Sequence, residues 1–353
     1  MINFDFSMKQ SSIAETIKSL GINVEFTDRK SDYFLTVLTR TQGLRPYLLK
    51  EVMLCLMAQD CDDFEWIIAV HRADDDKRNS MIEMVNHSPY SFNSRVRILD
   101  IQDGNRTRPL NVGFEEARGR YVSVLDDDDI VLAHWVSEFK SMAESNSGKV
   151  LRTMPLWQDY TVQKGPTSKE HTSCSVEAPR RGTDKYDFWK HFYLNESPIH
   201  SLAFPSAAFQ EFGINFNEEL NATEDWDFLL RTVSVCGIYS SAVPTSIYRK
   251  FRNLDNSNTE HNTAEWMKCY DIIQNNLNNK HFIIPPGNIL NLNSKTAGKE
   301  DVNEESAPNG SLSSVSAANS RRLFRRAIQV LRNEGMYVLL YKIFHRLVRW
   351  RDK

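Results

Sequence analysis

The sequence lacks the patterns that mark several common classes of protein. It contains neither the G-x-G-x-x-G nor the G-x-x-x-x-G-K-[ST] pattern, so the glycine-rich loops that cradle dinucleotides or triphosphates are poorly supported. No run of about 18 apolar residues occurs, so we expect no membrane-spanning helix. The apolar stretch at residues 2–6 is too short for a signal peptide and contains Asp5.

Cysteine is scarce and shows no ligand-like spacing. Neither C-x-x-C nor C-x-x-x-H occurs, and the number of cysteines is odd. The five are Cys55, Cys61, Cys174, Cys236 and Cys269. We therefore predict free thiols in a reducing, cytoplasmic compartment and neither a zinc site nor a disulfide framework.

Charge is modest overall but unevenly placed. The 353 residues carry a formal net charge of −3, with 41% hydrophobic and 25% charged residues, which is ordinary globular composition. Residues 321–353 hold ten Lys and Arg against two Asp and Glu, so the rest of the chain is acidic. An acidic body argues against a nucleic-acid-binding core.

One short stretch combines a buried strand with a dense negative charge. Residues 121–125 are apolar and β-branched, which favours a buried strand, and Asp126 to Asp129 follow directly. Four adjacent carboxylates repel one another unless a cation lies between them. Oxygen ligands at a strand end suit Mg²⁺ or Mn²⁺. The alternative is a solvated acidic turn.

The region before this stretch alternates between strand and helix patterns. Strands are predicted at 33–39, 64–70 and 95–99, and helices at 46–59, 75–87 and 109–118. This alternation is typical of βαβ units with a mostly parallel sheet flanked by helices. Right-handed crossovers place the strand ends on one rim, where Thr39 to Thr41, the loop after Val70 and the Asp run would meet. Such a half-domain suits a nucleotide.

A second acidic stretch begins at Thr223. Thr223 followed by Glu224 and Asp225 predicts a helix start, where the helix dipole favours ionised carboxylates. An ionised carboxylate at a cleft is suited to act as a general base on a hydroxyl group. Favourable electrostatics at a helix start, without catalysis, is the alternative interpretation.

The remaining segments are expected to be a mobile loop over the site at 160–184, closing strands at 236–243 and 246–251, and a helix at 265–276. Residues 285–320 have the composition of a disordered linker. Residues 321–353 predict a basic amphipathic helix, which suits an anionic membrane surface or, alternatively, packing on protein.

Several motifs in a fixed order resemble the inverting glycosyltransferases of family 2, which have the GT-A nucleotide-diphospho-sugar transferase fold. They are Ala58-Gln59, Asn111-Val112-Gly113, Ala117-Arg118-Gly119-Arg120-Tyr121, Leu125-Asp126-Asp127-Asp128-Asp129, Glu224-Asp225 and Tyr248-Arg249. The resemblance covers residues 33–284. It implies a GT-A domain (31–284, with a nucleotide half at 31–130 and an acceptor half at 131–284). Composition and periodicity predict an N-terminal extension (1–30), a linker (285–320) and a tail (321–353) around it.

The resemblance also implies roles. Asp126 and Asp128 match the Asp-x-Asp motif that holds the donor and a Mn²⁺ or Mg²⁺ ion. Asp225 matches the base, and Glu224 would orient the base or the acceptor. Expected donor contacts are Thr39, Arg40, Thr41, His71, Arg108, Asn111, Asp126 and Asp127, and expected acceptor contacts are His200 and Trp226. The partners would be a nucleotide-diphospho-sugar and a glycan or lipid-linked acceptor in polysaccharide or cell-envelope synthesis. The tail would touch the inner membrane face.

Three features qualify these expectations. His71-Arg72 stands where most relatives carry the Asp that contacts uracil, so the donor nucleotide stays open. No Gln-x-x-Arg-Trp motif follows, which argues against a processive synthase. A haloacid-dehalogenase-like phosphohydrolase would need a later Gly-Asp-x-x-x-Asp, which is missing, whereas a catalytically silent nucleotide-sugar-binding or scaffold protein on the same fold stays open.

Overall fold

The computed structural model describes residues 31–164, 171–254, 263–280, 282–285 and 288. The chain divides into two compact units, Met1–Ile289 and Leu290–Lys353, and every described residue belongs to the first. The predictions for residues 1–30 and for the tail lie outside the described residues, as do those for nearly all of the linker. Within the described ranges, no helix is long and apolar enough to cross a membrane.

The first half of the described chain alternates strands and helices, as predicted. The strands are β1 (Tyr33–Thr41), β2 (Phe64–His71), β3 (Val96–Ile101) and β4 (Gly119–Val124). The helices are α2 (Pro46–Met57), α3 (Asp75–Asn86), α4 (Tyr90–Asn93) and α5 (Arg108–Glu115). The four strands are parallel in the order β3-β2-β1-β4, so their carboxyl ends meet at one edge of the sheet.

Local sequence explains these elements. All eight residues of β2 are buried, because helices cover both faces of the sheet, and this is why its sequence is almost continuously apolar. Pro46 occupies the first turn of α2, where its fixed φ suits the helix and no hydrogen-bond donor is lost. A Cβ atom on Gly113 would lie 2.3 Å from Leu38 Cδ1, so a larger residue there would displace the Leu38 side chain or move α5 away from β1.

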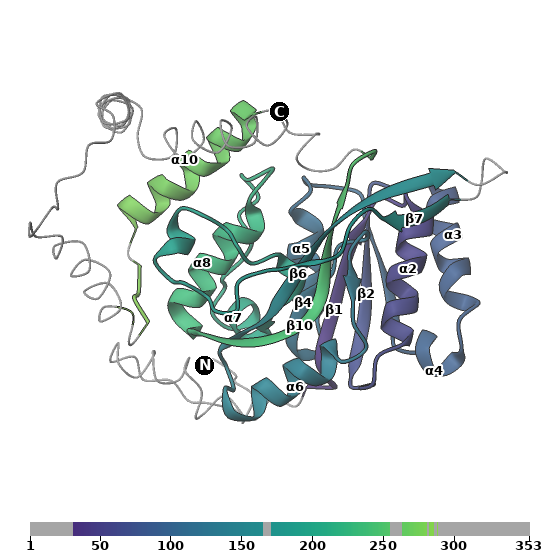
Figure 1. The fold of residues 1–353 in the computed structure, drawn as a ribbon, viewed down its shortest axis with the longest axis horizontal. Coiled ribbons are helices and arrows are strands. Elements are labelled where there is room, and N and C mark those ends of the chain that lie inside the picture. Colours follow the sequence, from purple (N-terminus) through teal and green to yellow (C-terminus); the bar gives the residue numbers. More distant parts are fainter. Residues whose placement is uncertain (1–30, 165–170, 255–262, 281, 286–287, 289–353) are drawn as a thin grey trace, which may run out of the picture. The chain divides into compact units, whose positions relative to one another are not determined.

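The second half extends the same sheet. Its strands are β5 (Ile130–Val131), β6 (Val150–Lys164), β7 (His171–Ser175), β8 (Arg180–Arg181), β9 (Leu202–Pro205) and β10 (Ile238–Phe251). Its α-helices are α6 (Trp135–Ser145), α7 (Ser206–Gln210), α8 (Glu224–Cys236) and α10 (Thr263–Asn279). The main path runs β3-β2-β1-β4-β9-β6-β10-β5, and β9 is antiparallel to both of its neighbours (Figure 1). The predicted α/β fold with a mostly parallel central sheet flanked by helices is confirmed.

Two local predictions are wrong. The described part of 160–184 is largely strand: β6 continues to Lys164, and β7 and β8 pair with it, so this region is built onto the sheet. The two closing strands are one strand, β10, whose pairing with β6 shifts register around Pro244. Pro244 carries no backbone donor, so the ladder is interrupted there while the chain continues in the same direction.

Two hydrophobic clusters hold the helices against opposite faces of the sheet. One includes Phe114 of α5 and Phe228 of α8, and the other includes Val52 of α2 and Phe139 of α6. Figure 1 shows α2 and α3 beside the purple strands and α8 toward the other end of the sheet. This layering fixes the carboxyl ends of β1 and β4, which carry the candidate site.

Candidate active site

The acidic run is a turn that directly follows β4. The Asp129 N–H donates to the carbonyl oxygen of Asp126 at 3.3 Å, and β5 then pairs with β10. The four side chains alternate in exposure: those of Asp126 and Asp128 are 30% and 20% exposed, whereas those of Asp127 and Asp129 are 12% and 2% exposed. The run is therefore not a uniformly solvated turn. Two of its carboxylates are accessible, and two are largely enclosed by protein.

Asp129 anchors the turn to the fold. Its Oδ1 accepts the backbone N–H of Arg249 at 2.8 Å, and its Oδ2 lies 2.9 Å from His200 Nδ1. His200 is fully buried and stacks beside Tyr248, with ring centroids 5.9 Å apart. The structure therefore places His200 beneath the turn, as a buried partner of Asp129, and away from the surface that an acceptor would reach.

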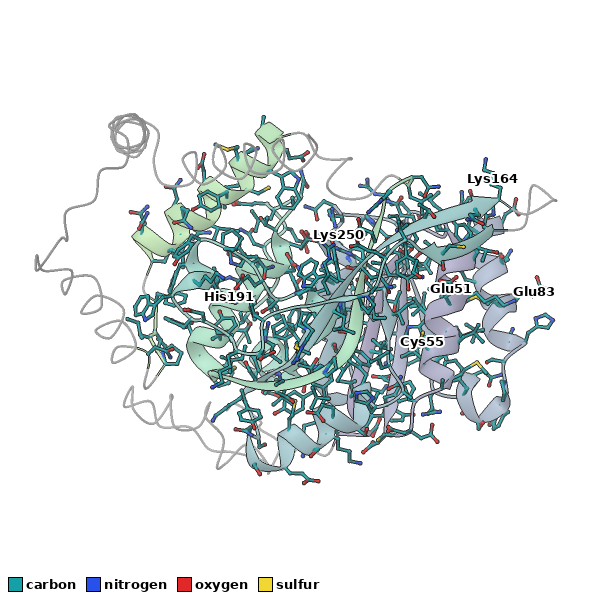
Figure 2. The ribbon with its side chains drawn as sticks, in the orientation of Figure 1. Glu51, Cys55, Glu83, Lys164, His191 and Lys250 are labelled. Carbon is teal, nitrogen blue, oxygen red and sulfur yellow. The ribbon has the colours of Figure 1, made fainter. Side chains whose placement is uncertain are left out.

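Arg249 fixes the backbone of the same turn. Its Nε donates to the carbonyl oxygen of Asp128, and its Nη1 pairs with Glu51, which projects from α2 (Figure 2). The guanidinium lies 5.3 Å from the ring centroid of Tyr160 and 5.2 Å from that of Phe251. The sequence offered Tyr248-Arg249 only as a shared motif. Its contact with the turn spans 121 residues, which no local pattern reveals.

Asp127 and Asp128 share one arginine. Arg45 Nη2 donates to Asp127 Oδ1 at 2.9 Å, and Arg45 Nη1 donates to Asp128 Oδ2 at 2.8 Å. Thr41 Oγ1 donates to the other oxygen of Asp127 at 2.6 Å. Burial raises the pKa of Asp127 despite Arg45, and burial together with the neighbouring Asp129 and Asp127 raises the pKa of Asp128 to about 8. Even with Arg45 present, negative charge exceeds positive charge at this turn.

The second acidic stretch begins α8, as predicted, but by a different local structure. Thr223 does not cap the helix through its side chain; its hydroxyl donates to the carbonyl oxygen of Ala222 at 2.5 Å. Its φ of 62° lies in the left-handed region, which costs a β-branched residue about 1–3 kcal/mol. This strained turn places Glu224 and Asp225 at the edge of the sheet that carries the acidic run.

Glu224 and Asp225 have opposite electrostatic environments. Glu224 is buried and pairs with Arg40 at 2.6 Å and Arg106 at 3.4 Å. Burial alone would raise the pKa of Glu224, but the two arginines outweigh it and lower that pKa. Asp225 is half-buried, and burial followed by the negative charge of Glu224 raises its pKa to about 6. Asp225 is thus the more basic of the two carboxylates and the more accessible.

Backbone and amide donors hold the Asp225 carboxylate. Its Oδ1 accepts the N–H of Trp226 at 2.8 Å, and its Oδ2 accepts from Asn195 Nδ2 at 3.4 Å. Asn195 lies in the loop that leads to β9, and its own Oδ1 accepts the N–H of Ser197 at 3.1 Å. Sequence reasoning gave Asn195 no role, because nothing local links it to α8.

Arg40 joins the two acidic stretches. It lies near the carboxyl end of β1, and its Nη1 donates to Glu224 at 2.6 Å and to the carbonyl oxygen of Arg106 at 3.1 Å. Its Nε lies 3.5 Å from Asp126 Oδ1. One guanidinium therefore bridges carboxylates that are about a hundred residues apart in sequence. The structure brings together Arg40, Thr41 and the acidic residues that the sequence singled out.

Other predicted contacts lie apart from this group. The Thr39 hydroxyl accepts Trp66 Nε1 at 2.9 Å inside the core, and His71 Nε2 lies 3.1 Å from the Asp103 carbonyl oxygen. Arg108 is 3.7 Å from Asp103 and 3.8 Å from Glu218, and Asn111 donates to Phe216 and Glu218. The Trp226 indole donates to the carbonyl oxygen of His191, which is labelled in Figure 2. Each of these side chains therefore has at least one partner within the fold.

Asp126 and Asp128 can hold a divalent cation only if further ligand atoms come from outside the protein. Asp126 and Asp128 offer accessible hard oxygen atoms where negative charge is in excess, which suits Mn²⁺ or Mg²⁺. In the described part of the chain, no group of three or more His, Cys, Asp or Glu residues could hold a metal by itself. A cation held here would complete its coordination with water and with oxygens of a bound phosphate, as Mg²⁺ commonly does.

Comparisons with known proteins agree with this geometry. Residues 45–198 match the family model described as glycosyl transferase family 2. Over 241 residues the chain is 24% identical to an uncharacterized glycosyltransferase of Methanocaldococcus jannaschii, covering 66% of this chain and 76% of that protein. Over 152 residues it is 26% identical to an uncharacterized glycosyltransferase of Rickettsia prowazekii, covering 42% of this chain and 45% of that protein. The predicted resemblance to family 2 glycosyltransferases is confirmed.

Solved structures with similar folds include two glycosyltransferases in complex with sugar nucleotides. The mannosyltransferase PcManGT from Pyrobaculum calidifontis, in complex with GDP-Man and Mn²⁺, is 12% identical, with a TM-score of 0.46 and coverage of 97% and 94% of the two chains. S. aureus TarS 1–349, in complex with UDP-GlcNAc, is 17% identical, with a TM-score of 0.48 and coverage of 69% of this chain and 66% of that chain. The chain spans under two thirds of TarS and under half of the Rickettsia relative.

Proposed function

We propose that the chain is a metal-dependent, inverting, non-processive glycosyltransferase that moves a hexosyl group from a nucleotide-diphospho-sugar to an acceptor hydroxyl. The observation that carries the proposal is the Arg40 bridge between Asp126, in the candidate donor site, and Glu224, the residue next to the candidate base Asp225. The family match over residues 45–198 and the relative matched over 241 residues support the same class of reaction.

The donor would bind along the carboxyl ends of β1 and β4. Asp126 and Asp128 would hold Mn²⁺ or Mg²⁺, which supplies positive charge to the leaving nucleotide diphosphate. Arg40 and Arg45 are further cations at this rim, and a guanidinium binds phosphate oxygens in the same forked geometry that it uses with carboxylates. Thr41 orients Asp127 and thereby Arg45, so we assign Asp127 a positioning role.

The acceptor would bind over the start of α8. Asp225 takes the proton of the acceptor hydroxyl, and that oxygen forms a bond to the anomeric carbon as the carbon–oxygen bond to the diphosphate breaks. Attack from the face opposite the leaving group inverts the configuration. Glu224 is ionised and paired with Arg40 and Arg106, so it is a positioning residue, and its negative charge raises the pKa of Asp225.

The biological setting is part of the proposal. The acceptor is a glycan or a lipid-linked glycan of polysaccharide or cell-envelope synthesis, and residues 321–353 contact an anionic membrane surface. Their basic, amphipathic sequence supports that contact. His200 and Trp226 are not among the proposed acceptor contacts, because both are buried within the fold.

A binding experiment tests the donor site. The thermal midpoint of the full chain is measured with UDP-, GDP-, dTDP- and CMP-sugars, each with and without Mn²⁺, because a ligand that binds only the folded state raises the midpoint. We expect one nucleotide to raise it in a metal-dependent way, and Asp128→Ala to abolish the rise. No rise with any donor contradicts the proposal. A rise without slow hydrolysis or transfer of the sugar indicates a silent binding protein.

A further inference from the structure

Arg45 occupies the space between two carboxylates of the acidic run. It is the residue immediately before α2, and its two terminal nitrogens reach different aspartates: Nη2 reaches Asp127 at 2.9 Å and Nη1 reaches Asp128 at 2.8 Å. The side chain is 27% exposed, so it lies at the mouth of the site. A guanidinium stays protonated at all physiological pH values, so this is a permanent positive charge.

The same carboxylate is needed for two cations. Asp128 is a ligand in the metal site proposed above, yet its Oδ2 is already bound to Arg45. A divalent ion that bound Asp126 and Asp128 would lie close to the guanidinium, and like charges at such a distance repel strongly in a partly buried site. Free metal and Arg45 therefore compete for the acidic run.

A bound diphosphate would change this balance. Arg45 follows a turn at Gly43, whose φ of 68° lies in the left-handed region and whose N–H donates to Thr41 Oγ1 at 3.0 Å. The partly exposed guanidinium could leave Asp128 by side-chain rotation and meet the oxygens of a bound diphosphate. A diphosphate adds negative charge that both Arg45 and the metal can share.

We propose that Arg45 is an internal counter-cation that keeps the acidic run closed to free divalent metal until a nucleoside diphosphate binds. This inference rests on the proposed function, because it assumes the metal site at Asp126 and Asp128. It has a thermodynamic consequence: metal and nucleoside diphosphate bind cooperatively, each raising the affinity of the other by the same factor. Arg45 is the source of that coupling.

The test measures Mn²⁺ binding directly. Free Mn²⁺ gives an electron paramagnetic resonance signal that falls on binding, so the full chain is titrated with Mn²⁺ alone and with Mn²⁺ plus UDP or GDP. Wild type should bind Mn²⁺ weakly alone and tightly with the nucleotide. Arg45→Gln, which keeps a hydrogen-bond donor and loses the charge, should bind Mn²⁺ alone at least about tenfold more tightly. The added nucleotide should then raise its Mn²⁺ affinity by a smaller factor.

Two further variants separate charge from structure. Arg45→Lys keeps the charge and should keep weak Mn²⁺ binding in the absence of nucleotide. Arg78 is a matched control: it also spans two aspartates, Asp75 and Asp100, at 2.8 Å each, but on the surface. Arg78→Gln should bind Mn²⁺ as wild type does. The thermal midpoint of each variant shows that it is folded.

Three results would overturn the inference. One is Mn²⁺ affinity that is unchanged or weaker in Arg45→Gln, which is what a purely structural arginine predicts. Another is wild-type protein that binds Mn²⁺ equally well with and without nucleotide. These two leave the proposed glycosyltransferase intact. The third is no Mn²⁺ binding to any variant with any nucleotide, which removes the proposed metal site together with the inference.

Discussion

Each of the two acidic stretches places carboxylates next to one another, and the two stretches differ in how the fold separates the environments of those carboxylates. In the run after β4, four adjacent carboxylates divide by exposure: Asp127 and Asp129 are enclosed and bonded to the fold, and Asp126 and Asp128 are accessible. At the start of α8, two adjacent carboxylates divide by charge partner: Glu224 has two arginines, and Asp225 has amide donors.

This difference explains how neighbouring residues of the same type acquire different chemistry. Glu224, which is paired with two arginines, is held ionised and is a weak base, as its lowered pKa indicates. Asp225 is a stronger base, because burial and the negative charge of Glu224 raise its pKa. In the acidic run the same crowding instead creates excess negative charge, which favours a cation. The following four predictions test this contrast.

The largest expected effect is on catalysis at α8. Asp225→Asn should lower kcat by about 10²–10⁴-fold, because it removes the general base while keeping the side-chain shape. Steady-state kinetics with the donor identified by thermal shift measure it. Asp227→Asn is the control, since Asp227 pairs with Arg231 on the same helix at 2.6 Å. An equal loss of kcat in both variants would indicate that α8 matters only structurally.

The next effect is on stability at the Arg40 bridge. Arg40→Ala should lower the free energy of unfolding by about 3–5 kcal/mol, because it leaves the buried Glu224 without its main partner. Denaturant unfolding measures it. Adding Glu224→Gln to Arg40→Ala should restore part of the loss, whereas Arg78→Ala breaks only exposed pairs and should cost less than about 1 kcal/mol. If the second substitution restores nothing, the uncompensated charge is not the cause.

Within the acidic run, exposure predicts which substitution affects the fold. Asp129→Ala should lower the free energy of unfolding by about 1–3 kcal/mol, because the Arg249 N–H loses its acceptor and His200 loses its partner in a dry environment. Asp126→Ala should change stability little and should weaken donor binding. Unfolding curves and thermal shifts with donor measure both. If Asp126→Ala lowered stability and Asp129→Ala did not, the assignment of Asp129 as an anchor of the fold and of Asp126 as an accessible ligand would be wrong.

The smallest expected effect is a shift in pH dependence. Asp225 must be ionised to act as a base, and burial together with Glu224 raises its pKa to about 6. With saturating Mn²⁺, which holds Asp128 ionised, kcat/KM should be level above that pH and fall tenfold per unit below it. Glu224→Gln removes a negative charge that raises this pKa, so the acidic limb should move to lower pH. A pH profile of kcat/KM for both proteins measures the shift. A limb that moves to higher pH would contradict the assigned role of Glu224.

The sequence predicted the fold closely where its patterns are local. The strand at 64–70, the proline at the start of α2 and the strand that ends at the acidic run each depend on neighbouring residues, and each was found within a few positions. The loop prediction at 160–184 was wrong. It rested on Gly, Ser, Thr and Pro residues and on weak periodicity, whereas β6 and β7 are stabilised by antiparallel pairing with each other. The sequence also missed that Thr223 starts α8 in a strained left-handed conformation.

Of the candidate site, the sequence by itself determined the two acidic stretches and, for the run after β4, the sheet edge on which it lies. A buried strand followed by carboxylates and a helix that begins with carboxylates are short-range patterns with direct physical meaning. Only the tertiary structure decided how those carboxylates divide their roles. Arg40, Arg45 and Arg249 each meet a partner 82 to 198 residues away, and burial and distance, which no local pattern encodes, set which carboxylate is neutralised and which is left basic.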